Sequence, residues 1–138
     1  MGIQIGPHRI EVENDILFAY VSHRLQLEEL KQIHDLCEKA HARFGSAYLV
    51  TVMGPGYELP PECRKHAAEW GRDHDLYNLV VGASFAIRTL INLLSRASKL
   101  VGARNPGVDF VTTIDEARQR IAEHKERVAN SQENLKNL

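Results

Sequence analysis

Two short runs of strand-forming residues constrain the fold of this chain more than any other feature. Residues 47–53 and 79–83 are almost wholly apolar, and each is followed by a segment with helical periodicity, at 60–71 and at 85–101. Apolar runs of this length are typical of strands that are buried on both faces inside a parallel or mixed sheet. Strands that alternate with helices in this way predict an α/β fold with these two runs as its inner strands.

The flanking segments predict the remaining elements. Residues 8–13 and 16–21 are expected to form a hairpin around a turn, and residues 27–44 form an amphipathic helix that ends before a glycine. Residues 108–112 read as a last short strand, and a capping box that begins at Thr113 predicts a final helix. We therefore expect a mixed sheet of about five strands, covered by about four helices.

The composition fits one domain and excludes several classes of function. Apolar residues make up 43% of the 138 residues, which is enough for one core without disulfides or structural metals. The net charge of −1 gives no reason to expect nucleic-acid binding. Two cysteines are no disulfide framework, and Arg88 and Asn92 interrupt the most apolar helix, so we expect a cytoplasmic protein without a transmembrane segment. The domain should span residues 1–128, followed by a polar, frayed tail at 129–138.

Four local features follow one another in an order that is found in a known family. They are the opening hairpin with its helix, the helix end Ala68-Glu69-Trp70, the strand end Val80-Val81-Gly82 before a helix with Arg88, and Phe110 before Asp115-Glu116-Ala117. Over residues 8–128 the chain thus resembles the STAS domains, and among them the SpoIIAA-like family of small bacterial proteins. The motifs are loose and mostly concern the fold.

This resemblance implies a non-enzymatic regulatory or interaction module that binds a protein partner, either another protein or a second copy of itself. In the anti-sigma antagonist branch of the family, a Ser or Thr at the start of the second helix is phosphorylated. The matching stretch, residues 53–62, contains neither residue, so the phosphorylation switch and its kinase cannot be carried over. No cofactor is indicated.

A candidate binding site follows from the positions of the strand ends. Tyr57 and Glu58 come after the first inner strand, and Ser84 and Phe85 come after the second. Open α/β sheets bind ligands at the carboxyl ends of their strands, so a site is expected between these two segments. The sequence around Ser84 partly matches a nucleophile elbow, but Ala86 replaces the last glycine. A helix cap is the simpler role for Ser84, and no catalytic residue is expected.

The helix predicted at 85–101 has an apolar face that is wider than packing on a sheet requires. Its additional apolar positions are Ala86, Leu93, Ala97 and Leu100, and its polar face carries Arg88, Arg96 and Lys99. The cationic face is either solvated or a docking surface for an anionic partner or lipid head group. The apolar face can pack on a second copy, or it can line a pocket. A carrier for a small apolar ligand or lipid is therefore the alternative function.

One helix also carries three potential metal ligands. His34, Cys37 and His41 are spaced so that they lie on neighbouring turns. Zinc prefers four tetrahedral donors, only three are local, and Cys37 belongs to the apolar stripe of the helix. We therefore interpret Cys37 as a buried core residue between two boundary histidines, and we expect no metal site.

Overall fold

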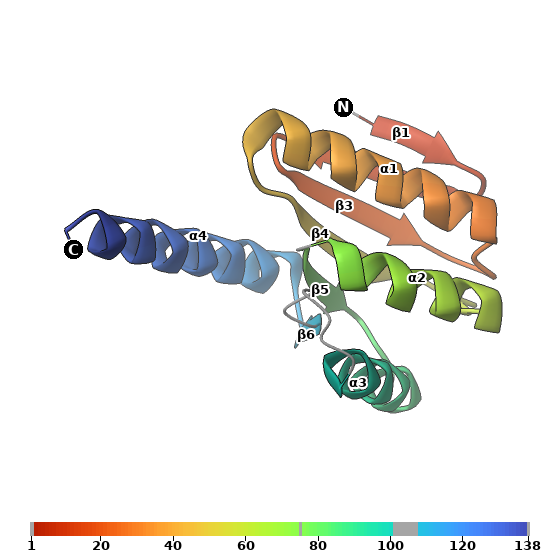
Figure 1. The fold of residues 1–138 in the computed structure, drawn as a ribbon. Coiled ribbons are helices and arrows are strands. Elements are labelled where there is room, and N and C mark those ends of the chain that lie inside the picture. The colour runs from red at the N-terminus through yellow and green to blue at the C-terminus, as the bar shows by residue number, and fades with distance from the viewer. Residues whose placement is uncertain (1, 75, 101–107, 138) are drawn as a thin grey trace.

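The computed structural model describes residues 2–74, 76–100 and 108–137, except for the side chains of residues 91, 94, 95 and 97–100. Within these ranges the fold is a six-stranded mixed sheet with four helices (Figure 1). The elements are β1 (Gly2–Ile5), β2 (His8–Glu13), β3 (Ile16–Val21), α1 (Leu27–Phe44), β4 (Tyr48–Met53), α2 (Pro61–Asp73), β5 (Tyr77–Val81), α3 (Phe85–Leu100), β6 (Val108–Val111) and α4 (Ile114–Lys136). The predicted α/β class and the order of the predicted elements are confirmed.

The strands lie in the sheet in the order of the sequence. β1, β2 and β3 pair antiparallel, whereas β3, β4, β5 and β6 pair parallel. β4 and β5 are inner strands, as their apolar sequences predict. Parallel strands need crossover connections, which are almost always right-handed. When successive crossovers add strands in the same direction across the sheet, their helices lie on the same face. α1 and α2 accordingly lie side by side over one face (Figure 1).

The sheet has one strand more than the five that the sequence predicts. The additional strand is β1, whose Ile3 and Ile5 alternate with Gly2 and Gln4 and pair with β2. The turn into β2 depends on Gly6, which has a φ of 57° and lies so close to the Glu29 carboxylate that a Cβ would clash with it. β1 is a short edge strand, and its half-buried pattern is difficult to recognise in only four residues.

The helix ends follow the predicted capping residues. α1 ends at Gly45 in the left-handed conformation, and α2 has Pro61 in its first turn. Thr113 Oγ1 accepts a hydrogen bond from Glu116 N at 3.1 Å to cap α4. Gly71, which the sequence suggests as the end of α2, lies inside the helix. No helix in the described ranges has both the length and the apolar character needed to cross a membrane.

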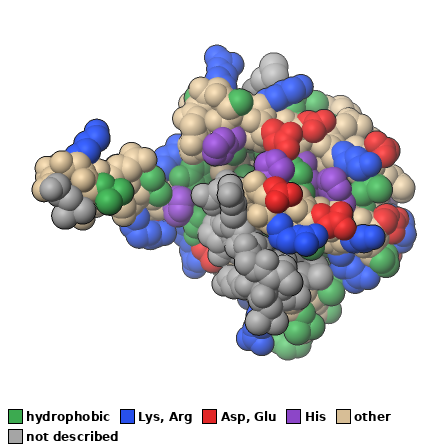
Figure 2. All heavy atoms as spheres, viewed as in Figure 1, with side chains coloured by type: hydrophobic (Ala, Val, Ile, Leu, Met, Phe, Trp, Pro, Cys, Tyr) green, Lys and Arg blue, Asp and Glu red, His purple; other side chains and the backbone are tan. Residues whose placement is uncertain are grey.

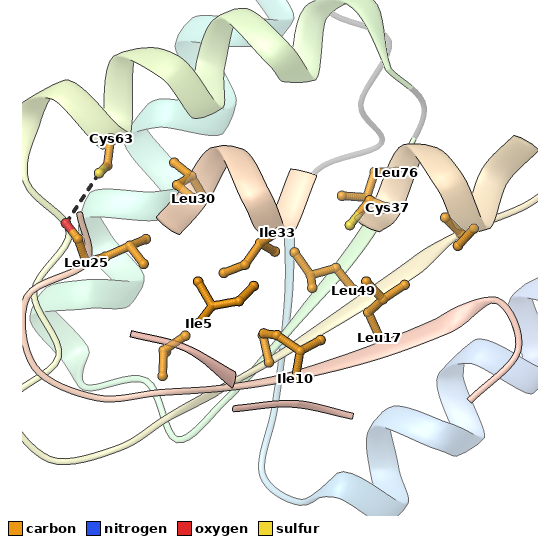
Figure 3. Close-up of a cluster of buried hydrophobic side chains, with 14 residues drawn as sticks. Ile5, Ile10, Leu17, Leu25, Leu30, Ile33, Cys37, Leu49, Cys63 and Leu76 are labelled. Atoms are coloured by element: carbon orange, nitrogen blue, oxygen red, sulfur yellow. Dashed lines mark hydrogen bonds between the residues drawn. The ribbon is translucent and has the colours of Figure 1, made fainter. Parts of the chain in front are cut away.

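A hydrophobic core lies on each face of the sheet. α1 contributes Leu30, Ile33 and Cys37 to a cluster of buried side chains that also contains Leu17 and Leu49 of the strands (Figure 3). On the opposite face, Phe18, Val50 and Leu79 pack together with the first turns of α4. The two cores are separate because successive residues of each strand point to opposite faces.

α4 is anchored only along its first turns. Ala117 and Ile121 are buried, His124 Nδ1 lies 2.9 Å from the Tyr48 hydroxyl, and Lys125 Nζ lies 2.9 Å from Asp15. Beyond this point every described side chain is exposed, and the helix projects away from the sheet (Figure 1). Residues 129–136 of the predicted frayed tail thus continue α4 as a regular helix.

Candidate functional site: a small apolar pocket

A pocket with a volume of about 170 Å³ lies between the sheet and the two helices that cover it. Its floor is formed by β3, β4 and β5, and its roof by α1 and α2. Tyr57 and Leu59, from the connection between β4 and α2, complete its wall. Most of its lining is apolar, as in typical small-molecule sites.

Small side chains on both floor and roof create this pocket. The strand register places Ala19, Thr51 and Val80 in one row across the floor. Above them, α2 presents Ala67 and Ala68. Because these floor and roof residues are small, they leave a space between the sheet and α2. Elsewhere in the core, larger side chains fill the corresponding space.

Two buried polar atoms in the lining of this pocket have no hydrogen-bond partner among the described residues. They are Nδ1 of His34, which belongs to the roof, and Oδ1 of Asn78, which belongs to the floor. His34 is only 6% exposed. Leaving a buried donor or acceptor unsatisfied costs about 1–3 kcal/mol, so each atom needs a partner inside the pocket. Either water or a polar group of a ligand can supply it.

The His34 ring belongs to a stack of four rings that joins α1 to α2. His34 lies between His66, at a centroid distance of 5.1 Å, and Trp70, at 4.2 Å. His74 stacks on the other face of Trp70 at 4.1 Å, and its Nε2 lies 2.7 Å from Glu38 Oε1. On this face of the molecule, histidines lie among acidic and basic side chains (Figure 2). The stack fixes the orientation of His34 and of Trp70 at the pocket wall.

Burial keeps two titratable side chains of the pocket lining, His34 and Tyr57, in their neutral forms. Burial lowers the pKa of His34 to about 3, with the nearby His66 and His74 acting in the same direction. Burial raises the pKa of Tyr57 to about 12, and Cys63 adds to that effect. Both shifts arise mainly because a charged form would lose its hydration here. The lining also includes Arg64, which is partly exposed and therefore partly solvated.

The structure brings only one of the predicted site residues into this pocket. Tyr57 lines it, whereas Glu58 is exposed and lies 3.6 Å from Arg24 in an ion pair. Backbone hydrogen bonds link this loop to the segment after β3: Glu58 N donates to His23 O, and Leu25 N donates to Glu58 O. The loop therefore forms a wall of this pocket, which lies beneath the helices, and the binding site expected between the loop and Ser84 stays a prediction.

The other predicted site residues lie along α3. Ser84 caps the helix, because its Oγ accepts a hydrogen bond from Ile87 N at 3.3 Å. The exposed fraction is 86% for Phe85 and 59% for Leu93. The exposed Arg88 lies over the ring of Phe110.

The exposure of Ala86 and Leu93 agrees with the wide apolar face that the sequence indicates, whereas the exposed Phe85 is not among the residues predicted for that face. Arg96 is also exposed, in line with the predicted cationic face. Ala97, Lys99 and Leu100, which complete the two predicted faces, lie outside the residues whose side chains are described.

The three potential metal ligands on α1 do not share an environment. His34 and Cys37 are buried, whereas His41 is exposed. Burial raises the pKa of the Cys37 thiol to about 12. Among the described residues, no group of three His, Cys, Asp or Glu side chains is arranged to hold a metal ion.

Four polar or aromatic residues of the pocket, Thr51, Asn78, His34 and Trp70, are not among the binding-site residues that the sequence predicts. A weak signal for two of them is present, since Thr51 and Asn78 are polar residues at or beside otherwise apolar strand segments. A polar side chain on an inner strand must find a partner or a cavity. The signal for His34 and Trp70 is tertiary, because their stacking depends on how α1 meets α2.

Comparison of the chain with models of protein families, with curated proteins and with solved structures found no match. The residues and the geometry of the pocket therefore carry the functional interpretation.

Proposed function

We propose that this chain is a non-enzymatic ligand-binding module of STAS type, which holds a small apolar molecule in the pocket beneath α1 and α2. The observation that carries this proposal is an apolar pocket of about 170 Å³, in whose lining two buried polar atoms have no partner within the described part of the chain. The resemblance of the element order and of the Trp70 and Arg88 positions to STAS domains supports the assignment of type. Binding of a small molecule is a means of regulation that needs no phosphorylated residue in the 53–62 loop.

The state of the nucleophilic side chains supports a non-catalytic role. Burial raises the pKa of both Cys37 and Cys63, so neither thiol is activated as a thiolate. Cys63 Sγ instead donates to Leu25 O (Figure 3). Ser84 is used as a helix cap.

The experiment is a titration of the purified chain with toluene. Trp70 is the only tryptophan in the sequence and lies at the pocket wall, so its fluorescence reports on occupancy. We expect saturable quenching or enhancement together with a rise in melting temperature, because a ligand that binds only the folded state stabilises it.

Two variants test whether toluene binds inside this pocket. Ala19→Leu fills the pocket from the floor and Ala68→Leu fills it from the roof, and either change should abolish the toluene response. Val52→Leu is the matched control, because Val52 follows Thr51 in β4 but belongs to the core on the opposite face. A toluene response that persists in both filled variants, with their melting temperatures retained, would contradict the proposal.

Self-association through α3 is a second candidate function, favoured by the exposure of Phe85 and Leu93. We propose a second copy of the chain as the partner, since a two-fold axis would bring the same apolar patch of each copy together. Sedimentation velocity over a wide concentration range should show a dimer, and Phe85→Ser with Leu93→Ser should abolish it. A strict monomer at high concentration would exclude this candidate and leave the ligand-binding proposal in place.

A further inference from the structure

Two pocket atoms lack a hydrogen-bond partner among the residues that the structure describes, and they indicate which chemical groups a ligand must offer. Asn78 Oδ1 is a hydrogen-bond acceptor, so it requires a donor from the ligand. His34 Nδ1 belongs to a neutral imidazole, in which each ring nitrogen either donates or accepts. Because Asn78 lies on β5 and His34 on α1, the two atoms are presented from opposite walls.

The environment of these atoms selects against a charged ligand. The same loss of hydration that keeps His34 and Tyr57 neutral would act on any ion placed beside them. Among the described residues of the lining, Arg64 is the only lysine, arginine or acidic residue, and it is partly exposed to solvent. Its charge is therefore partly stabilised by water without an anion from the ligand.

The dimensions of the pocket limit the ligand to about one ring. An engineered apolar cavity of roughly 150 Å³ in another protein binds benzene, which is close to the 170 Å³ found here. Sites for drug-sized molecules are larger, at roughly 300–1,000 Å³. The walls include the flat side chains of Trp70, Tyr57 and His34, which suit a planar ring.

Building on the proposed ligand-binding function, we propose that the pocket selects a neutral, single-ring molecule with a hydroxyl or N–H group that donates a hydrogen bond to Asn78 Oδ1. The ring lies among the apolar side chains of the floor and roof, and a polar group of the ligand contacts His34 Nδ1.

The test compares two ligands of nearly the same shape, 4-methylphenol and 1,4-dimethylbenzene, which differ by a hydroxyl in place of a methyl group. Dissociation constants are measured from the NMR shift of the Trp70 indole N–H. In the Asn78→Leu variant, the affinity ratio should move by about tenfold toward dimethylbenzene, which corresponds to one hydrogen bond to a buried acceptor. His34→Phe keeps a flat ring in the stack and should shift the ratio in the same direction. Val52→Leu, on the opposite face, should leave it unchanged.

The possible outcomes separate this inference from the function on which it rests. Binding of both ligands with the same ratio in the natural chain and in Asn78→Leu would overturn the inference and retain the pocket as an apolar site. If neither ligand binds the natural chain, the proposed function itself fails. Tighter binding of benzoate than of 4-methylphenol, lost in Arg64→Gln, would show that the ligand is an anion and would overturn the neutral class proposed here.

Discussion

The two faces of the same sheet are packed in different ways, although they are built from alternate residues of the same strands. On the α4 face, Phe18, Val50 and Leu79 form one row of large side chains. One residue further along each strand, the row on the other face is Ala19, Thr51 and Val80. A shift of one residue thus exchanges a filled core for a pocket.

The two faces also differ in whether their polar groups are paired. On the α4 face, the hydroxyl of Tyr77 donates to Asp109, and that of Tyr48 pairs with His124. On the pocket face, His34 Nδ1 and Asn78 Oδ1 are left without partners among the described residues. Most buried polar groups in proteins have a hydrogen-bond partner, either within the protein or from ordered water. The comparison assigns a structural role to the α4 face and supports the proposal that the pocket face binds a ligand.

The largest expected loss of stability comes from creating a cavity in the core on the α4 face. Leu79→Ala should lower the free energy of unfolding by about 2–5 kcal/mol, because Leu79 is fully buried and the change leaves a cavity. Met53→Ala, at the half-buried edge of the pocket, should cost only about 1 kcal/mol, because less apolar area leaves water. Urea denaturation measures both, and equal costs would argue against a difference in packing between the faces.

A second prediction concerns acid and the pocket face. The pKa of His34 is about 3 in the folded chain and near 6.5 when unfolded, so below pH 6.5 the unfolded state binds a proton that the folded state does not. Stability should therefore fall by about 2 kcal/mol at pH 5, relative to pH 7, on account of His34 alone.

The control for this prediction is His34→Gln, which retains all other titratable groups. It should lose less stability than the natural chain between pH 7 and pH 5 when both are followed by urea denaturation. Parallel pH profiles of the two proteins would contradict the view that His34 remains uncharged in the pocket.

The smallest expected loss of stability concerns an ion pair at the edge of the α4 face. Arg118 pairs with Glu13 through two hydrogen bonds of 2.6 and 2.9 Å and lies over the ring of Phe18. Both charged side chains are about half exposed, so Arg118→Ala should cost only about 0.5–1 kcal/mol. The cost should decrease in high salt, and a larger, salt-independent loss would show that packing on Phe18 dominates.

Most of the fold could be predicted because its determinants are local. Apolar runs identify β4 and β5, and the caps at Gly45, Ser84 and Thr113 mark helix ends within a residue or two. β1 could not be predicted as readily, because it is too short to show a period and gains its stability by pairing with β2.

The pocket could be predicted only in part, because it depends on register. Ala19, Thr51 and Val80 are far apart in the sequence, and each is ordinary for its own strand. Only their alignment across β3, β4 and β5 turns three small residues into one hollow. Tyr57 could be found from its place after an inner strand, whereas the contact of His34 with Trp70 depends on how two helices meet.

The division of α4 into an anchored and a free part has a consequence for how the helix forms. An isolated helix of a dozen residues is marginal in water, because its first turn fixes several dihedral angles for a single hydrogen bond. In α4 the packing of Ala117 and Ile121 on the sheet fixes that first turn, and the exposed residues up to Lys136 need only extend it. The projecting end thus propagates from a helix that the sheet has already nucleated. Its backbone amides should exchange with solvent deuterium far sooner than those beside the sheet.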